Sequence, residues 1–262
     1  MKKPSILRNK VFDPTVVKSQ VTDVALVQRR REQIVEAAIA LFSRQGYYKT
    51  TIQQIARKAG VSIGLIYQYA QTKDDVLLLS LMSVMEVYKR ELPRSSSDGG
   101  ESLALLRAAL ETYCRVVDER RDAAVLAYRS TMSLPREYRD YIKQVEVDTN
   151  EFISIRLRSC IAAGLFREIN VDLATYQLVL YAHTWALKYW RLSEFTDLDG
   201  YIEQGFDFFV HAMATRKGML QYRRLQEARR KPAAKRSAAG KRNIAKPVIK
   251  KTPTRRITPA AA

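Results

Sequence analysis

Cysteine, histidine and glycine are scarce in this chain of 262 residues, which has two, two and ten of them. Cys114 and Cys160 lack the short spacing of a Cys-x-x-Cys motif. The sequence therefore predicts neither a disulfide framework nor a structural zinc site, and it fits a reducing compartment. Uninterrupted apolar runs of membrane-spanning length and a signal-peptide pattern are also missing. We expect a cytoplasmic protein that makes no contact with a membrane.

Acidic residues are almost missing from the C-terminal end. Residues 216–262 hold 16 Lys and Arg against one acid, Glu227, a net charge of +15, whereas residues 1–215 carry 29 basic and 26 acidic residues, a net of +3. The stretch 218–262 is expected to be a disordered basic tail, although residues 218–230 could extend the last helix. From Pro232 on, the tail is rich in Pro, Ala, Lys and Arg and has too few apolar residues to fold alone. It resembles bacterial histone-like tails, which contact phosphates without sequence preference. A nucleoid association is one interpretation, and a solubilising tail is the alternative.

Helical periodicity dominates the rest, and no segment shows the alternation of a strand. Ile34, Ala38, Leu41 and Phe42 share one apolar stripe, and similar stripes recur up to about residue 214. The sequence predicts an all-α fold with four parts. These are a flexible arm (1–24), a small three-helix domain (25–92), a larger helical domain (101–217) and the basic tail (218–262).

Residues 51–73 have the form of a helix-turn-helix unit. Thr51 and Gln54 match a capping box, Gly60 allows a left-handed turn, and Ser62 caps the second short helix. A solvated hairpin inside a bundle is the alternative, but the outward face suits DNA. Gln68 matches the hydrogen-bonding edge of adenine, and lysine and tyrosine suit phosphates. The predicted DNA contacts are Lys49, Thr50, Thr51, Gln53, Ser62, Ile63, Gly64, Leu65, Tyr67, Gln68, Tyr69 and Lys73.

Residues 30–79 resemble the DNA-binding region of the TetR family of bacterial transcriptional regulators. The resemblance rests on Arg31-Glu-Gln-Ile34, Ala37-Ala38, Leu41-Phe42, Gly46-Tyr47, Thr50-Thr51, Ile55-Ala56, Ala59-Gly60-Val61-Ser62, Gly64, Tyr67, Tyr69, Lys73 and Leu77. Two residues depart from the family pattern. Leu65 replaces a usual threonine and removes a hydroxyl that could reach DNA, so no operator sequence is carried over. Ala70 replaces a usual phenylalanine, so that corner of the core must be filled differently.

The resemblance implies a homodimer that binds an inverted-repeat operator on double-stranded DNA and is released by a small molecule, in most members as a repressor. It places the dimer contacts on the last two core helices, 172–192 and 199–214. Their aromatic composition is typical of interfaces. The expected interface residues are Leu178, Tyr181, Ala182, Tyr189, Phe206, Phe209 and Val210.

A ligand pocket is expected between the DNA-binding region and those helices. Its candidate residues are Tyr113, Cys114, Tyr128, Arg129, Met132, Phe152 and Trp185. This apolar set with one cation suits an amphipathic molecule with an anionic end, such as an acyl-CoA or a hydrophobic acid. His183 and His211 are expected to be structural rather than metal ligands, and no cofactor is predicted.

No catalytic combination of residues emerges, so an enzyme is not expected. Two alternatives to a ligand-responsive regulator stay open. One is an architectural, nucleoid-organising protein whose basic tail dominates DNA binding. The other is an acyl-binding or enzymatic helical bundle.

Overall fold

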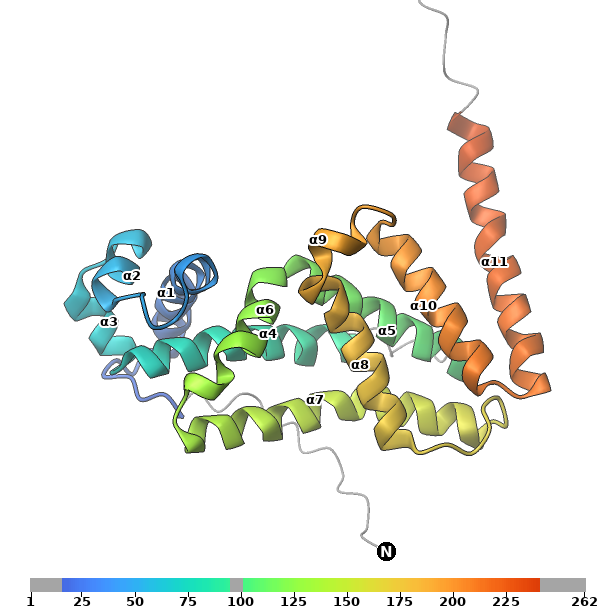
Figure 1. Ribbon diagram of the computed structural model, residues 1–262, viewed down its shortest axis with the longest axis horizontal. Helices are drawn as coiled ribbons and strands as arrows, with labels where there is room; N and C mark the ends of the chain where they lie inside the picture. The colour runs from blue at the N-terminus through green and yellow to red at the C-terminus, as the bar shows by residue number, and fades with distance from the viewer. Residues whose placement is uncertain (1–15, 95–100, 241–262) are drawn as a thin grey trace, which may run out of the picture. The chain divides into compact units, whose positions relative to one another are not determined.

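The computed structural model describes residues 16–94 and 101–240, which form helices joined by short connections (Figure 1). The helices of the first half are α1 (Val24–Gln45), α2 (Ile52–Ala59), α3 (Ile63–Tyr69), α4 (Lys73–Arg94), α5 (Ser102–Glu119) and α6 (Arg121–Ser130). A 3₁₀ turn, η1 (Thr131–Ser133), follows. The remaining helices are α7 (Arg136–Ala162), α8 (Val171–Leu187), α9 (Tyr189–Leu192), α10 (Leu198–Met213) and α11 (Arg216–Gly240).

The all-α prediction is confirmed. Among the described residues β pairing is limited to an isolated bridge between Phe166 and Ala214. None of the described helices is long and apolar enough to cross a membrane.

The predicted helix boundaries around the helix-turn-helix unit are also confirmed. The Thr51 side chain accepts from Gln54 N while the Gln54 side chain accepts from Thr51 N, which is a complete capping box. Gly60 has φ 67° and ends α2 in the left-handed conformation, and Ser62 Oγ accepts from Leu65 N at the start of α3.

Helices α1, α2 and α3 gather around the N-terminal part of α4 (Figure 1, blue to cyan). The shared core of this region contains Phe42, Ile55, Ile66 and Val76, all nearly inaccessible to solvent. Because α3 has only seven residues, its position depends on this packing rather than on its own helix propensity.

The N-terminal segment from residue 16 is packed, which corrects the prediction of a flexible arm up to residue 24. Val17 is buried in the same core as Ala70, the residue that departs from the family's usual phenylalanine. Buried Arg31 donates hydrogen bonds to the carbonyl oxygens of Val17 and Tyr69, and Gln20 N donates to Gln68 O at 2.8 Å. Residues 1–15 of the predicted arm lie outside the described residues.

The larger helical region is built around α5, which contacts α4, α7, α8 and α10. Helices α4, α6 and α7 also contribute to the core of the DNA-binding region, through Leu81, Leu126 and Ile142 among others. The chain up to Gln221 accordingly forms one compact unit. The predicted division near residues 92–101 does not coincide with a boundary of this unit, and residues 95–100 lie outside the described part.

Two segments differ from the sequence prediction. The predicted helix 172–192 is two helices, α8 and α9, separated at Lys188. Helix α11 extends to Gly240, whereas the sequence allowed a helix only up to residue 230 and predicted disorder beyond it. Residues 216–231 consist largely of the strong helix formers Arg, Leu, Gln, Lys and Ala, which accounts for the first part of this helix. Residues 241–262 of the predicted tail lie outside the described residues.

Candidate nucleic-acid interface and ligand cavity

The outward face of α3 and the start of α2 form a continuous candidate DNA-binding surface. Eight of the twelve predicted contact residues are exposed on it: Lys49, Thr51, Gln53, Ser62, Ile63, Gly64, Tyr67 and Gln68. A side-chain β-carbon at Gly64 would meet no atom within 4 Å, so the fold itself does not require glycine there. The exposed Gly64 therefore suits a close approach of another molecule to the helix.

Four predicted contacts need correction or restriction. Tyr69 is 3% exposed and Thr50 is 1% exposed, so neither side chain is available for DNA. The reason for Thr50 is that its hydroxyl donates to Gly46 O at 2.8 Å, and Tyr69 turns into the core beside Ala70. Leu65 is partly buried against the same core. The Lys73 ammonium group donates to Tyr47 O and Thr50 O, both at 3.1 Å. Only part of its hydrogen-bonding capacity is therefore left for a phosphate.

Sequence analysis missed Tyr48, which lies in the connection between α1 and α2 beside Lys49. Its side chain is 79% exposed, and its ring packs edge-on against Tyr47. An aromatic residue two positions before Thr50 and the capping box was the available signal. Its exposed hydroxyl suits a phosphate contact.

Asp75 connects the DNA-reading helix to the rest of the protein. This buried carboxylate accepts from the backbone N–H groups of Gln71 and Thr72, at 2.9 and 3.0 Å, in the corner between α3 and α4. Its other oxygen accepts from the Tyr138 hydroxyl of α7 at 2.5 Å. Burial and this hydrogen bond raise the pKa of Tyr138 to about 12. The corner that orients α3 therefore contacts α7 directly.

A cavity of about 320 Å³ lies among α4, α6, α7 and α8. Most of its walls are apolar and come from Leu81, Val84, Met85, Ala124, Ala127, Ile142 and Leu180. Its polar groups belong to Tyr88, Tyr128, Thr131, Lys143, Glu146 and His183. A mainly apolar cavity of this size with a few convergent polar groups is typical of small-molecule sites.

Of the seven predicted pocket residues, Tyr128 lines this cavity. Tyr113, Cys114 and Trp185 are instead buried core residues, Arg129 and Met132 are exposed, and Phe152 lies partly buried outside the cavity lining. Aromatic content alone did not distinguish core from cavity. Arg129, the cation of the predicted set, is not part of this lining.

His183 is a hydrogen-bonded core histidine, as the sequence suggested. Its Nδ1 lies 2.8 Å from the Tyr128 hydroxyl and its Nε2 lies 3.3 Å from the Tyr88 hydroxyl. Burial lowers the pKa of His183 to about 4, so the imidazole is neutral near pH 7. Behind it, Tyr113 stacks on Tyr88 with ring centroids 4.2 Å apart and donates to Asn150 Oδ1 at 3.4 Å.

The two charged residues of the lining differ in their surroundings. Lys143 is largely exposed and pairs with Asp140 at 3.0 Å. Glu146 is partly buried, and burial raises its pKa. Within the described part of the chain, no hydrogen bond or ion pair to the Glu146 carboxylate is found.

The predicted dimer residues are mostly internal. Leu178, Ala182, Phe206 and Val210 are at most 1% exposed within a single chain, because these faces of α8 and α10 belong to the chain's own core. Tyr181 and Phe209 are partly buried and pack edge-on, while Tyr189 is exposed in part. Periodicity identified apolar helices but not which face is internal. The exposed apolar residues of these two helices are Leu173, Tyr176, Leu180 and Phe208.

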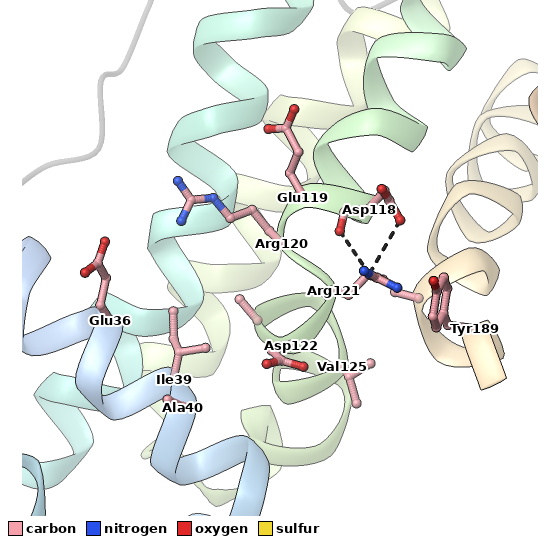
Figure 2. Close-up of a pocket in the computed structure, with 12 residues that line it drawn as sticks. Glu36, Ile39, Ala40, Asp118, Glu119, Arg120, Arg121, Asp122, Val125 and Tyr189 are labelled. Atoms are coloured by element: carbon pink, nitrogen blue, oxygen red, sulfur yellow. Dashed lines mark hydrogen bonds and ion pairs between the residues drawn. The ribbon is translucent and has the colours of Figure 1, made fainter. Parts of the chain in front are cut away.

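A second cavity, of about 480 Å³, lies between α1 and the corner that joins α5 to α6 (Figure 2). Figure 2 shows Glu36 and Ile39 of α1 on one side and Arg120 and Asp122 on the other. The Arg121 guanidinium pairs with Asp118 at 3.5 Å and lies 3.8 Å from the centre of the Tyr189 ring. Four carboxylates and two arginines make this cavity polar and charged, so it does not suit an apolar ligand.

A helix-turn-helix region packed on a helical body with an internal apolar cavity defines the class of ligand-responsive transcriptional regulators. Comparison with known families agrees. Residues 34–79 match the family described as "Bacterial regulatory proteins, tetR family", and residues 99–191 match "Tetracyclin repressor-like, C-terminal domain". The chain belongs to the TetR family of DNA-binding transcriptional regulators.

Individual relatives support this assignment. The chain is 49% identical over 202 residues to the transcriptional regulator HbdR of Aromatoleum sp. (strain CIB). This alignment covers 77% of this chain and 88% of HbdR. The fold is similar to a tetR-family regulatory protein from Rhodococcus RHA1, with TM-score 0.65, 17% identity and coverage of 71% of this chain and 97% of that chain. It is also similar to FadR from Bacillus subtilis in complex with stearoyl-CoA, with TM-score 0.57, 20% identity and coverage of 68% and 97%.

Replacing Gly64 by alanine separates folding from DNA binding. Because the added β-carbon has open space and alanine favours helix, Gly64→Ala should raise the free energy of unfolding by up to about 1 kcal/mol. Operator affinity should nevertheless fall at least about tenfold if DNA approaches this position. Urea unfolding and fluorescence anisotropy measure the two effects. Unchanged affinity would show that α3 does not contact DNA at this position. Glu168→Gln, exposed in the connection between α7 and α8, is the control.

Buried His183 makes folding stability depend on pH. Its folded pKa of about 4 lies below the ordinary value of 6.5, so the unfolded chain binds the proton first. The contribution of neutral His183 to the free energy of unfolding is fully present above pH 6.5. It falls by up to about 3 kcal/mol as the pH drops towards 4. The raised pKa of Glu146 acts in the opposite direction, so the comparison with His183→Gln isolates the histidine. Urea unfolding at several pH values measures this dependence. The free energy of unfolding of His183→Gln should change less between pH 6.5 and 4 than that of the native protein, whereas replacement of the exposed His211 by Gln should leave the change as it is. The same pH dependence in His183→Gln and the native protein would contradict the burial of a neutral His183.

Proposed function

We propose that the protein is a homodimeric repressor that binds an inverted-repeat operator and is released from it by an apolar or amphipathic effector. The observation that carries this proposal is the position of α4 and α7. Both helices line the cavity, and both meet at the Asp75–Tyr138 hydrogen bond beside α3. A ligand in the cavity can therefore act on the DNA-reading helix through only two packed elements.

The mechanism is a shift between two helix arrangements. An effector that binds one arrangement better moves α4 and α7 against each other and changes the orientation of α3 through the Asp75 corner. In a twofold dimer, this alters the separation of the two α3 helices and their fit to two half-sites. Operator affinity then falls by a factor equal to the ratio of the effector's affinities for the released and the DNA-bound arrangement.

We assign the dimer interface to the exposed apolar faces of α8 and α10 rather than to their buried ones. Leu173, Tyr176 and Leu180 follow one another at helical spacing on α8, and Phe208 is 69% exposed on α10. The inner faces of both helices are already covered by the same chain. Apolar and aromatic residues are enriched at the centres of protein interfaces, and the composition of these exposed faces fits this rule.

An acyl-CoA-like effector is favoured over a short hydrophobic acid. The apolar walls suit an acyl or aromatic group, and exposed Lys143 lies at the rim, where it suits an anionic portion outside the cavity. The similar fold of the FadR protein with stearoyl-CoA is consistent with such a ligand.

Selection from a pool of random DNA duplexes tests the proposed function. The expected result is one enriched inverted repeat, bound by a dimer in analytical ultracentrifugation. Phe208→Arg should yield a monomer and weaken operator binding at least about a hundredfold, because a buried charge disrupts the interface. Phe195→Arg, an exposed aromatic residue before α10, is the matched control. Broad coating of AT-rich DNA, or a Phe208→Arg dimer with full affinity, would contradict the proposal.

The basic C-terminal segment supports a second, sequence-independent contribution to DNA binding. Residues 231–262 contain ten Lys and Arg and no Asp or Glu. Cations that neutralise phosphates release counterions, so their contribution falls steeply with salt. This segment is proposed to strengthen general DNA affinity while the dimer searches for its operator.

Deletion of residues 231–262 keeps buried Tyr222 and most of α11, and it should flatten the salt dependence of DNA binding. Each lost phosphate contact lowers the slope of log affinity against log salt by about 0.9. A full-length variant with these ten Lys and Arg replaced by Gln is the control for chain length. It should reduce the salt dependence of DNA binding as much as the deletion does. An unchanged slope in both proteins would refute a DNA-binding role of the segment.

A further inference from the structure

We propose a second small-molecule site, between α7 and α8, that binds a carboxamide. The carbonyl oxygen of the ligand accepts hydrogen bonds from Asn150 Nδ2 and the Thr175 hydroxyl, and an N–H group of the ligand donates to a carboxylate at the rim. The lining of this site shares no residue with the cavity assigned above to the effector. The inference therefore does not depend on that assignment.

Buried polar atoms without a hydrogen-bond partner concentrate at this place. Among the described residues, three buried side-chain nitrogen or oxygen atoms lack such a partner: Arg107 Nε, Asn150 Nδ2 and Thr175 Oγ1. Arg107 pairs through another nitrogen with Glu203. Asn150 and Thr175, both 3% exposed, line one cavity of about 290 Å³. Buried donors and acceptors are almost always satisfied in folded proteins, so two missing partners at one cavity indicate a bound molecule.

The side-chain amide of Asn150, on α7, supplies the first donor. Its Oδ1 accepts from the Tyr113 hydroxyl at 3.4 Å, and its Nδ2 is left without a partner in the part of the chain that the structure describes. An amide nitrogen carries two protons and cannot accept a hydrogen bond. The partner that Asn150 lacks is therefore an acceptor, such as an oxygen atom of a ligand.

The hydroxyl of Thr175, on α8, supplies the second polar group. Thr149 and Thr184, which lie inside α7 and α8, each donate to the carbonyl oxygen four residues earlier at 2.7 Å. Thr175 makes no such bond to its own helix, nor to any other described residue. Its proton is therefore available to an acceptor in the cavity.

Carboxylates lie at the rim of the cavity. Glu151 pairs with Arg158 at 2.7 Å and accepts from the Ser154 hydroxyl at 2.9 Å. Asp172 is largely exposed, and an Arg158 nitrogen lies 3.9 Å from its carboxylate. Asp172 therefore keeps capacity to accept from an N–H group, and two carboxylates beside one arginine leave the rim with a net negative charge.

This arrangement favours a carboxamide over other small polar groups. A carboxylate would bring a like charge to the acidic rim, and an ammonium group has no oxygen for Asn150 and Thr175. A carboxamide carries an acceptor oxygen and N–H donors in one group. Partly exposed Val147 and Tyr176 complete the lining and suit an apolar or aromatic attachment. Because Tyr176 also lies on the α8 face that we assign to the dimer, the cavity borders the proposed interface.

Four benzene derivatives test this inference by calorimetry at pH 7 on the intact protein without DNA: benzamide, N,N-dimethylbenzamide, benzoate and benzylamine. Benzamide should bind at least about fivefold more tightly than the other three, because it alone brings both an acceptor oxygen and N–H donors without a charge. Thr175→Val nearly keeps the shape of the side chain and should weaken benzamide binding at least about fivefold. The midpoint of thermal unfolding of this variant should not fall, because a buried hydroxyl without a partner costs free energy that valine avoids.

Two controls separate this site from the rest of the protein. Thr184→Val, on the same helix, removes a hydroxyl that is bonded within the helix and should leave benzamide affinity unchanged. Ala127→Trp, which fills the effector cavity, should also leave it unchanged. A lost or weakened affinity in either control would overturn the inference.

Other results would also overturn it. These are no measurable binding of benzamide, equal binding of benzamide and benzoate, full benzamide affinity in Thr175→Val, or a lower unfolding midpoint of that variant. A crystal structure grown with saturating benzamide gives an independent readout. The benzamide oxygen should lie within hydrogen-bond distance of Asn150 Nδ2 and the Thr175 hydroxyl, whereas an ordered water alone at these atoms would contradict the site.

Discussion

The carboxylate of Asp75 holds together the corner on which DNA reading depends. It accepts two backbone N–H groups where α3 ends and α4 begins, and it accepts the Tyr138 hydroxyl from α7. Without this carboxylate, the N–H groups of Gln71 and Thr72 and the Tyr138 hydroxyl would lose the partner that links the α3–α4 corner to α7. The seven-residue α3 cannot hold its own conformation, so its orientation follows the position of this corner.

The cavity is built from the same helices that converge on Asp75. Helix α7 carries Tyr138 and, one to two turns further on, Ile142 and Glu146 of the cavity lining. Helix α4 follows directly on the Asp75 corner and contributes Tyr88 to the hydrogen-bonded chain around His183. Because the cores of the DNA-binding and ligand-binding regions are continuous, we expect close packing to transmit a small displacement from one to the other.

Local signals in the sequence predicted local structure well. The capping box at Thr51, the left-handed turn at Gly60 and the cap at Ser62 all follow from residue types a few positions apart. Features that depend on long-range packing were not accessible in this way. The sequence does not say that Tyr69 turns inward while Tyr67, two residues earlier, stays 43% exposed, because that choice depends on Val17 and Arg31. Likewise, apolar residues such as Leu178 and Phe206 mark α8 and α10 as buried without distinguishing the chain's own core from a partner. Most of the cavity lining other than Tyr128 was missed for the same reason, since Tyr88, Glu146 and His183 come from three helices far apart in the sequence.

The most direct test of the account is the coupling between the cavity and the DNA-binding surface through the Asp75–Tyr138 hydrogen bond. A double-mutant cycle on operator affinity measures it, with Ala127→Trp filling the cavity and Tyr138→Phe removing the hydrogen bond. Ala127→Trp should weaken operator binding in the native background, and this loss should be reduced at least about fivefold when Tyr138 is replaced. The same loss in both backgrounds would contradict transmission through Asp75.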